Sequence, residues 1–181
     1  MPEKWLIKNS QTDHMISYAL SQSVERNAMN RAFSVAIGCD EAGFELKELL
    51  KRHIEALGHP VEDFGTHSLE PVLYPDIALA VATAINAGHH RLGVLVCGTG
   101  IGMAISANKV LGIRAAQAHD TYSAERARKS NDAQILSVGA RVVGVELAKS
   151  IVKAFLESEF EAARSGAKVE RINAIERDGH Q

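Results

Sequence analysis

The sequence has few of the features that mark membrane, secreted or nucleic-acid-binding proteins. Only two of its 181 residues are cysteines, and its formal net charge is −2. Two cysteines do not make a disulfide framework, and so balanced a charge gives no support for general binding to nucleic acid or membrane surfaces. No apolar run approaches the roughly 18 residues of a membrane helix, and the first residues lack a secretory apolar region. We therefore expect a cytoplasmic protein without a nucleic-acid or membrane partner.

Metal-binding and nucleotide-binding patterns are also missing. None of the eight histidines is paired at a helical interval of four residues beside a carboxylate, as in common zinc motifs. The glycines at residues 98–102 are not followed by the Lys-Ser/Thr of a P-loop, and their spacing differs from the dinucleotide fingerprint. The sequence therefore predicts neither a metal nor a cofactor.

Strand-like and helix-like segments alternate from residue 33 onward. Short apolar runs predict five strands, at residues 33–38, 61–64, 92–96, 113–116 and 134–138. Helical patterns lie at residues 44–57, 76–86, 103–110, 121–129 and 145–156. Five strands separated by helices predict an α/β fold with a parallel sheet covered on both faces. We assign residues 33–177 to one domain.

The two ends of the chain differ from this core. Residues 1–32 form an N-terminal extension with a helical pattern at 13–26, and Met29 lies just ahead of the first strand. We interpret the extension as a surface appendage or an upstream start, with a functional arm as the alternative. Residues 161–177 predict a polar terminal helix with basic residues at Arg164, Lys168 and Arg171, which suits packing on a second subunit.

The most informative segment follows the third predicted strand, where Cys97 precedes the glycine-rich loop of residues 98–102 and a helix. Ligands of open α/β sheets bind outside the carboxyl ends of strands. The bare backbone N–H groups of such a loop favour an anion, and a helix N-terminus stabilises a thiolate. A buried inert cysteine and a tight structural turn are the alternative interpretations of the same residues.

Polar residues follow the other predicted strands as well. Asp40 and Glu41 come after the first strand, where a catalytic role and a helix cap are equally good interpretations. Asp120, after the fourth strand, is better explained as a helix cap. The Asn-Asp pair at residues 131–132 suits a turn, and Arg141 after the fifth strand suits either a phosphate or a surface ion pair.

Taken together, these motifs resemble those of the ribose-5-phosphate isomerase B and galactose-6-phosphate isomerase family, over residues 33 to about 176. The motifs are residues 38–44 (GCDEAGF), 97–102 (CGTGIG), 107–110 (ANKV), 112–115 (GIRA), 131–133 (NDA) and 139–142 (GARV). The resemblance implies a Rossmann-like three-layer α/β/α sandwich and a homodimer or dimer of dimers with sites at the subunit interface. It also implies metal-free aldose–ketose isomerisation of a small sugar phosphate through a cis-enediol.

The resemblance also implies a role for each candidate residue. Cys97 matches the family's usual base, and Met103 stands where a related branch has a catalytic carboxylate. Thr99 and the N–H groups of residues 98–102 would hold the enediolate oxygen, and Asp40 would contact the sugar hydroxyls. Further substrate contacts are expected from Glu41, Tyr74, Gly98, Gly100, Gly102, Asn108, Ser130 and Asn131, and phosphate contacts from Arg141 and, from the second subunit, Arg164 and Lys168.

Two residues depart from the family pattern. Glu41 replaces a phosphate-side histidine, and its carboxylate is unfavourable beside a dianion unless Arg141 or Lys168 pairs with it. It also suits an acid that moves protons between the two sugar oxygens. Ser130 replaces the histidine that opens the furanose ring, and serine cannot titrate near neutral pH. A four-carbon sugar 4-phosphate cannot close a furanose and so needs no ring opening, and residues 119–127 look like the tetrulose-phosphate isomerase branch. Tetrulose 4-phosphate is therefore a candidate substrate beside ribose 5-phosphate.

Two other functions are alternatives to this enzyme. One is a non-catalytic anion- or nucleotide-binding module built on the same glycine loop, and the other is a subunit of a hetero-oligomeric isomerase. Gln117 and Ala118 stand about where a dinucleotide-binding domain has its ribose-binding acidic residue, about 20 positions after the loop, which argues against a dinucleotide.

Overall fold

The computed structural model of the chain describes residues 32–179. The predicted helix at residues 13–26 and the candidate start at Met29 lie outside the described residues. The compact unit that carries the sheet begins at Phe33.

Five parallel strands form one sheet in the order β2-β1-β3-β5-β4, which confirms the predicted sheet. The strands are β1 (Val35–Cys39), β2 (Val61–Asp63), β3 (Leu92–Cys97), β4 (Ala115–Gln117) and β5 (Ile135–Gly139). The chain moves from β1 to β2 on one side and then returns past β1 to β3 on the other. The carboxyl ends of β1 and β3 therefore meet at a topological switch point, where open α/β sheets bind their ligands.

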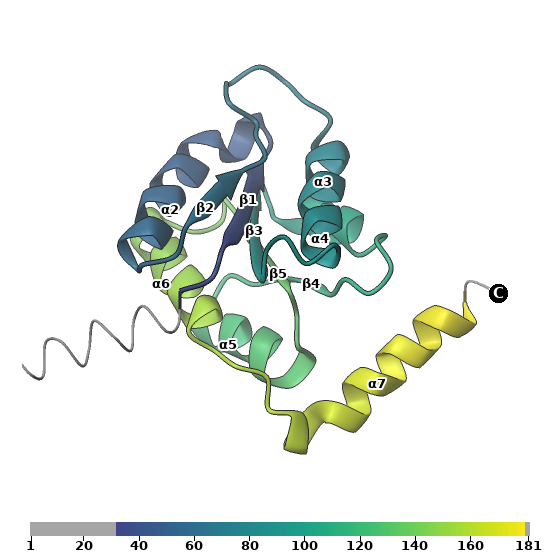
Figure 1. Cartoon of the computed structure of the whole chain (residues 1–181). Helices are drawn as coiled ribbons and strands as arrows, with labels where there is room; N and C mark the ends of the chain where they lie inside the picture. Colours follow the sequence, from purple (N-terminus) through teal and green to yellow (C-terminus); the bar gives the residue numbers. More distant parts are fainter. Residues whose placement is uncertain (1–31, 180–181) are drawn as a thin grey trace, which may run out of the picture. The chain divides into compact units, whose positions relative to one another are not determined.

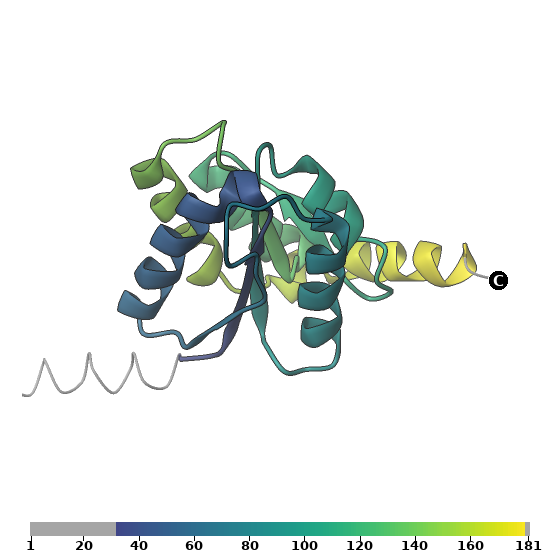
Figure 2. The ribbon, with the colours of Figure 1, turned by 90° about the horizontal axis from the view of Figure 1, so that it is seen from above.

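Helices cover both faces of the sheet (Figures 1 and 2). The helices are η1 (Glu41–Gly43, a 3-10 turn), α2 (Phe44–Ala56), α3 (Tyr74–Asn86), α4 (Ile101–Ala107), α5 (Thr121–Asn131), α6 (Val145–Leu156) and α7 (Ala162–Asp178). Helices α3 and α4 lie on one face, and α2, α5 and α6 lie on the other. This is the expected three-layer α/β/α sandwich. Helix α7 begins beside α5 and runs outside the three layers.

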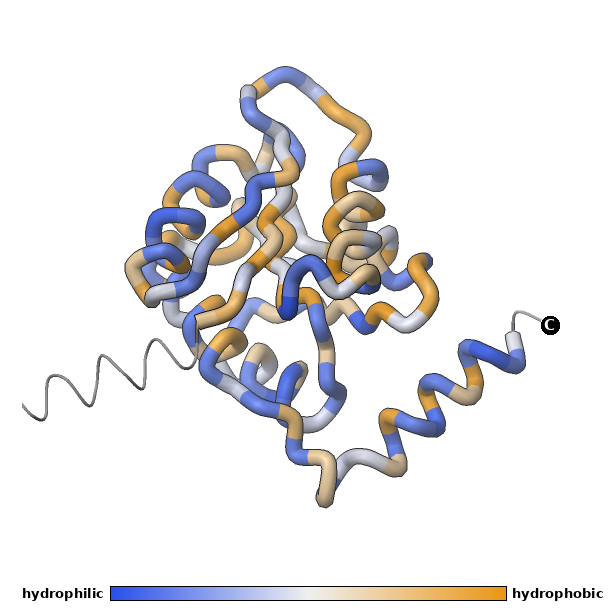
Figure 3. The backbone as a smooth tube through the Cα atoms, viewed as in Figure 1, coloured by the Kyte–Doolittle hydropathy of each residue, from blue (hydrophilic) through white to orange (hydrophobic). Residues whose placement is uncertain are grey.

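The strands are apolar on both sides because both faces are covered, and they are among the most hydrophobic parts of the chain in Figure 3. Successive strand residues alternate between two cores, so that Ile37 faces α2 while Leu95 faces α3 and α4. The same alternation separates the cysteines. Cys39 lies in the α2 core and Cys97 in the α3–α4 core, and both thiols are free.

Some element ends differ from the predictions for a physical reason. Helix α4 ends at Ala107 instead of residue 110, and β4 begins at Ala115 instead of residue 113. The Asn108 side chain explains both, because its amide nitrogen donates to the carbonyls of Ala104 (2.9 Å) and Ala115 (2.8 Å) while its oxygen accepts from the Ala115 N–H (2.7 Å). Helix α3 begins at Tyr74, two residues before the predicted start at residue 76. Pro75 lies in its first turn, where the missing N–H of proline would have no partner within the helix.

A buried ionic cluster joins α2 to the end of β2. The ammonium of Lys47, which is fully buried, lies 2.7 and 2.8 Å from the two carboxylate oxygens of Asp63 and donates to the carbonyl of Thr66 at 2.8 Å. Lys51 also donates to Asp63, at 2.9 Å. Burial by itself raises the pKa of Asp63, but the hydrogen bonds from Lys47, from the Gly65 N–H and from Lys51 outweigh it and hold the pKa below its ordinary value.

The ionic cluster predicts a stability loss on substitution of Asp63. Asp63→Asn leaves the buried Lys47 ammonium without its full counter-charge, and we expect the free energy of unfolding at pH 7 to fall by about 3–5 kcal/mol. Urea denaturation measures this quantity. Glu146→Gln, at the exposed Lys149–Glu146 pair, is the control and should cost no more than about 1 kcal/mol.

The Asp63→Asn variant also allows the pH dependence of stability to be tested. A carboxyl whose folded pKa is lowered stabilises the protein above its unfolded pKa, about 3.9 for aspartate, and this stabilisation is lost as the pH falls through the folded value. The advantage of the wild type over Asp63→Asn should therefore shrink below about pH 4. If the free energies of unfolding of the wild type and Asp63→Asn differed by the same amount at pH 7 and pH 3, the assignment of a charged Asp63 carboxylate would be wrong.

Candidate active site

Cys97 ends β3 at the switch point, and its side chain is turned toward α3 and α4 with 5% of the residue exposed. The backbone N–H of Gly100 donates to its sulfur at 3.0 Å. Gly100 makes this turn with φ at +78°, in the left-handed region that residues with a Cβ disfavour. The thiol therefore has a polar donor at the start of α4 and is not surrounded only by apolar groups.

Two side chains that were not predicted to contact the glycine loop hold it in place. The hydroxyl of Ser137, on β5, donates to the carbonyl of Gly100 at 2.7 Å. The amide nitrogen of Gln117, on β4, donates to the carbonyl of Thr99 at 2.7 Å. In the sequence, Ser137 could have been noticed as a polar residue in the otherwise apolar strand Ile135–Gly139. Gln117 has no such distinguishing feature beyond its position near the end of a strand.

Asp40 follows β1, the strand beside β3, and is 9% exposed. Its carboxylate accepts the N–H of Gly43 at 2.9 Å and so caps η1. Burial raises the pKa of Asp40; the Gly43 hydrogen bond and Arg141 oppose the rise, and the charge of Glu41 adds to it. Asp40 thus acts as a cap, but of the 3-10 turn η1, whereas the predicted helix α2 has Gly43 at its N-cap and no side-chain cap. A carboxyl with a raised pKa therefore lies at the edge of the site.

Tyr74 and Arg141 flank the glycine loop. A Cβ placed on Gly102 would lie 2.8 Å from the Tyr74 ring, so the ring lies directly on that glycine and leaves no room for a larger residue. A Cβ on Gly98 would lie 3.6 Å from the Cδ atom of the Arg141 side chain, and the backbone N–H of Arg141 donates to the Gly98 carbonyl at 3.0 Å. Both side chains are exposed at this edge. The structure thus brings Tyr74, Arg141, Cys97 and the loop together.

Glu41 has a contact that no sequence pattern indicated. Its carboxylate accepts the backbone N–H of Val72, 31 residues away, at 3.3 Å. Val72 lies just before α3, the helix that begins with Tyr74. Glu41 therefore ties the segment that leads to Tyr74 onto the turn beside Asp40, in addition to its charge effect on Asp40.

His119 is a further titratable residue at this edge of the sheet. Its Nε2 accepts the N–H of Gly139 at 3.1 Å, and Gly139 pairs with Cys97 across β3 and β5. A neutral imidazole that accepts at Nε2 carries its proton on Nδ1. The neighbouring Asp120 accepts the N–H of Ser123 at 2.7 Å, which confirms it as the cap of α5.

Other expected site residues do not meet Cys97 within one chain. Ser130 and Asn131 end α5 and precede β5, whose first residue pairs with Gly93, four residues before Cys97. At about 3.3 Å per strand residue, they lie toward the opposite, amino edge of the sheet.

The remaining two basic residues, Arg164 and Lys168, are exposed on α7. Asn108 uses its amide to join α4 to β4, as described above.

Residues 32–179 contain neither a cluster of metal ligands nor a membrane-spanning helix. No group of three or more His, Cys, Asp or Glu side chains in this range is arranged to hold a metal ion. No helix in the same range is both long enough and apolar enough to cross a membrane.

Comparison with known proteins identifies the family. The sequence matches the family model described as ribose/galactose isomerase over residues 35–172. It is 52% identical over 150 residues to the D-erythrulose-4-phosphate isomerase of Pectobacterium atrosepticum (82% of this chain, 99% of the relative). It is 52% identical over 142 residues to the ribose-5-P isomerase B of Listeria innocua (78% and 96%). The structure of Clostridium thermocellum ribose-5-phosphate isomerase B matches with a TM-score of 0.78 and 44% identity (80% and 98%).

The switch-point site and the Rossmann-like sandwich thus occur in a chain whose relatives are sugar-phosphate isomerases. The chain belongs to the ribose/galactose isomerase family. The expected enzyme class and fold are confirmed at this level.

The two cysteines are expected to differ in reactivity. Burial raises the pKa of the Cys39 thiol to about 12, so it holds almost no thiolate at pH 8. Cys97, which receives the Gly100 N–H, should be alkylated by iodoacetamide in the native protein, and Cys39 only after unfolding. Peptide mass spectrometry measures both sites, and native Cys97→Ser protein is the unlabelled control. Native labelling of Cys39 as fast as Cys97 would contradict this assignment.

Proposed function

We propose that this chain is a cytoplasmic, metal-independent aldose–ketose isomerase whose substrate is a tetrulose 4-phosphate, with ribose 5-phosphate as the second candidate. The observation that carries the proposal is the Cys97 sulfur, held by the Gly100 N–H at the carboxyl edge between β1 and β3. The names of the relatives support the two substrate types. The absence of a titratable side chain at Ser130 favours the tetrulose, which needs no ring opening.

In the proposed mechanism, the Cys97 thiolate removes the proton from the carbon next to the carbonyl. The electron pair of that C–H bond forms the carbon–carbon double bond of a cis-enediolate, and the carbonyl oxygen takes the negative charge. We assign the stabilisation of this oxygen to Thr99 and the backbone N–H groups of the loop, an effect worth about 3–4 kcal/mol per donor in well-formed oxyanion holes. The thiol then returns the proton to the neighbouring carbon.

The two oxygens of the substrate must also exchange a proton. Asp40 is suited to this transfer, because a carboxyl with a raised pKa binds and releases a proton closer to neutral pH than an exposed aspartate does. Arg141, whose guanidinium cannot be neutralised, is suited to the phosphate. Its stem lies against Gly98, on the same side of the loop as Ala42.

We infer that the complete site requires a second copy of the chain. Ser130, Asn131, Arg164 and Lys168 lie away from Cys97 in their own chain, although all four are expected at the substrate. Helix α7 also exposes Ile172 and Ile175, at 43% and 56%, outside the three layers. A homodimer that covers α7 brings these residues to the partner's glycine loop.

A panel of four-, five- and six-carbon sugar phosphates tests the substrate. We expect kcat/KM for erythrulose 4-phosphate to exceed that for ribose 5-phosphate by at least about tenfold, because a lost acid–base group for ring opening costs about 10² or more. Enzymatic turnover measured with equal enzyme preparations gives the ratio. Equal or better turnover of ribose 5-phosphate would exclude the tetrulose preference but not the isomerase.

The role of Cys97 is tested by its own replacement. Cys97→Ser should lower kcat by about 10³-fold or more, because a serine hydroxyl does not ionise near neutral pH and so supplies no anionic base in place of the thiolate, while substrate Kd by calorimetry stays within about threefold. Cys39→Ala removes the other thiol and should retain turnover. Wild-type-like turnover by Cys97→Ser would remove Cys97 from the mechanism.

Deuterium incorporation in heavy water separates the other candidate functions. An isomerase expressed alone incorporates solvent deuterium at carbon, whereas an anion-binding module does not. A subunit of a hetero-oligomeric enzyme needs its partner before it does so.

A further inference from the structure

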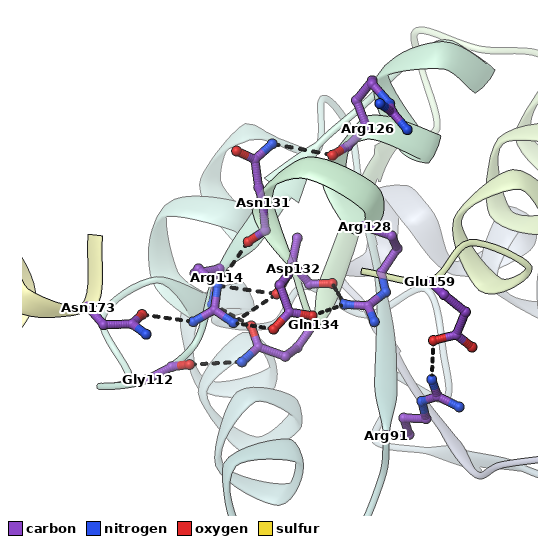
Figure 4. Close-up of polar contacts among 11 residues, drawn as sticks. Arg91, Gly112, Arg114, Arg126, Arg128, Asn131, Asp132, Gln134, Glu159 and Asn173 are labelled. Carbon is purple, nitrogen blue, oxygen red and sulfur yellow. Dashed lines mark hydrogen bonds and ion pairs between the residues drawn. The ribbon is translucent and has the colours of Figure 1, made fainter. Parts of the chain in front are cut away.

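Arg114 directly precedes β4, at the amino edge of the sheet, and is the centre of a cluster of polar side chains (Figure 4). Its Nε donates to the carbonyls of Asn131 at 3.0 Å and of Asp132 at 3.2 Å. Its Nη2 donates to the carbonyl of Asp132 at 2.9 Å and to the carboxylate at 3.0 Å. Its Nη1 donates to the side-chain oxygen of Asn173, on α7, at 3.1 Å. One side chain thus joins the segment before β4 to the end of α5 and to α7.

The turn after α5 is held from a second side as well. Arg128, which is buried, donates to the Asp132 carboxylate at 2.8 Å and to the carbonyl of Ala133 at 2.9 Å. Asp132 has a left-handed φ of +46°, an unusual backbone conformation for a residue with a Cβ. Two guanidinium groups therefore fix the carboxylate and the backbone of the turn that directly follows Ser130 and Asn131.

Helix α7 meets this cluster along one face. Ser165 and Val169 are buried, Asn173 contacts Arg114, and Glu176 accepts the N–H of Gly112 at 2.9 Å. Spacings of four, four and three residues place these side chains on one side of the helix. Arg164 and Lys168 are exposed, so the face that contacts the rest of the chain leaves the expected phosphate ligands accessible.

We propose that Arg114 is a positioning residue that holds the Ser130–Asn131 turn and helix α7 in one fixed arrangement, and that this arrangement completes the active site of a second copy. This proposal rests on the proposed function. The guanidinium suits the task because it offers five donors in a rigid planar fork, whereas lysine offers one compact ammonium. Arg114 would act through Ser130, Asn131, Arg164 and Lys168 without touching the substrate itself.

Kinetics of Arg114→Gln provide the first test. We expect KM for the sugar phosphate to rise at least about tenfold, the equivalent of one charge-assisted hydrogen bond, with kcat changed less than about threefold. Asn173→Ala removes only the link to α7 and should give a smaller rise in KM; it serves as the test variant if Arg114→Gln does not fold. Arg177→Gln is the matched control, because Arg177 donates to Glu170 within α7 and should leave both constants unchanged.

Mixed dimers distinguish a positioning role in the partner's site from a merely structural one. Differently tagged Arg114→Gln and Cys97→Ser chains are co-expressed, and the mixed dimer is isolated by both tags. If Arg114 serves the partner, one site combines the intact Cys97 of one chain with the intact Arg114 of the other. That site should show wild-type KM and about half of the wild-type kcat per dimer.

Each outcome bears on a different claim. A mixed dimer that keeps the raised KM of Arg114→Gln, or an Arg114→Gln protein with wild-type KM, would overturn the positioning role while the isomerase activity stands. A wild-type chain that turns over no sugar phosphate would overturn the proposed function and this role with it.

Discussion

The parallel register of β3 and β5, which pairs Cys97 with Gly139, is the constraint on which the candidate site depends. Beyond this last residue pair, backbone hydrogen bonds continue to join the two segments. The N–H of Ala140 donates to the Cys97 carbonyl at 2.8 Å, and the backbone N–H of Arg141 donates to the Gly98 carbonyl. Main-chain hydrogen bonds at the ends of buried strands therefore position the backbones of Cys97 and Arg141 beside each other. A site built this way keeps its geometry without relying on a mobile loop.

Local chemistry explains which features were predictable from the sequence. The apolar runs gave all five strands, and the cap at Asp120 follows from its own neighbours, three residues away. Contacts between distant segments were not predictable. The amide of Asn108 shortens α4 by reaching Ala115, and the carboxylate of Glu41 reaches Val72. The burial of Lys47 was not predicted either, because the helical periodicity of α2 does not show that a lysine is buried beside the carboxylate of Asp63 on β2.

Glu41, which departs from the family pattern, has two effects on its surroundings. Its acceptor role toward Val72 holds the segment before α3, and its charge helps to raise the pKa of Asp40. A histidine at this position would be able to carry a positive charge and would lower the pKa of Asp40 in that state. A glutamate at this position therefore favours the protonated form of the neighbouring carboxyl.

The two groups of expected site residues lie at opposite edges of one sheet, and this separation follows from the α/β topology. In a parallel sheet every strand ends at the carboxyl edge and every crossover helix returns to the amino edge. Residues at the end of α5 cannot reach the end of β3 of the same sheet without unfolding the helix between them. If Ser130 and Asn131 touch the substrate, as the family resemblance implies, they must do so in another copy, so catalysis and dimerisation would depend on the same surface.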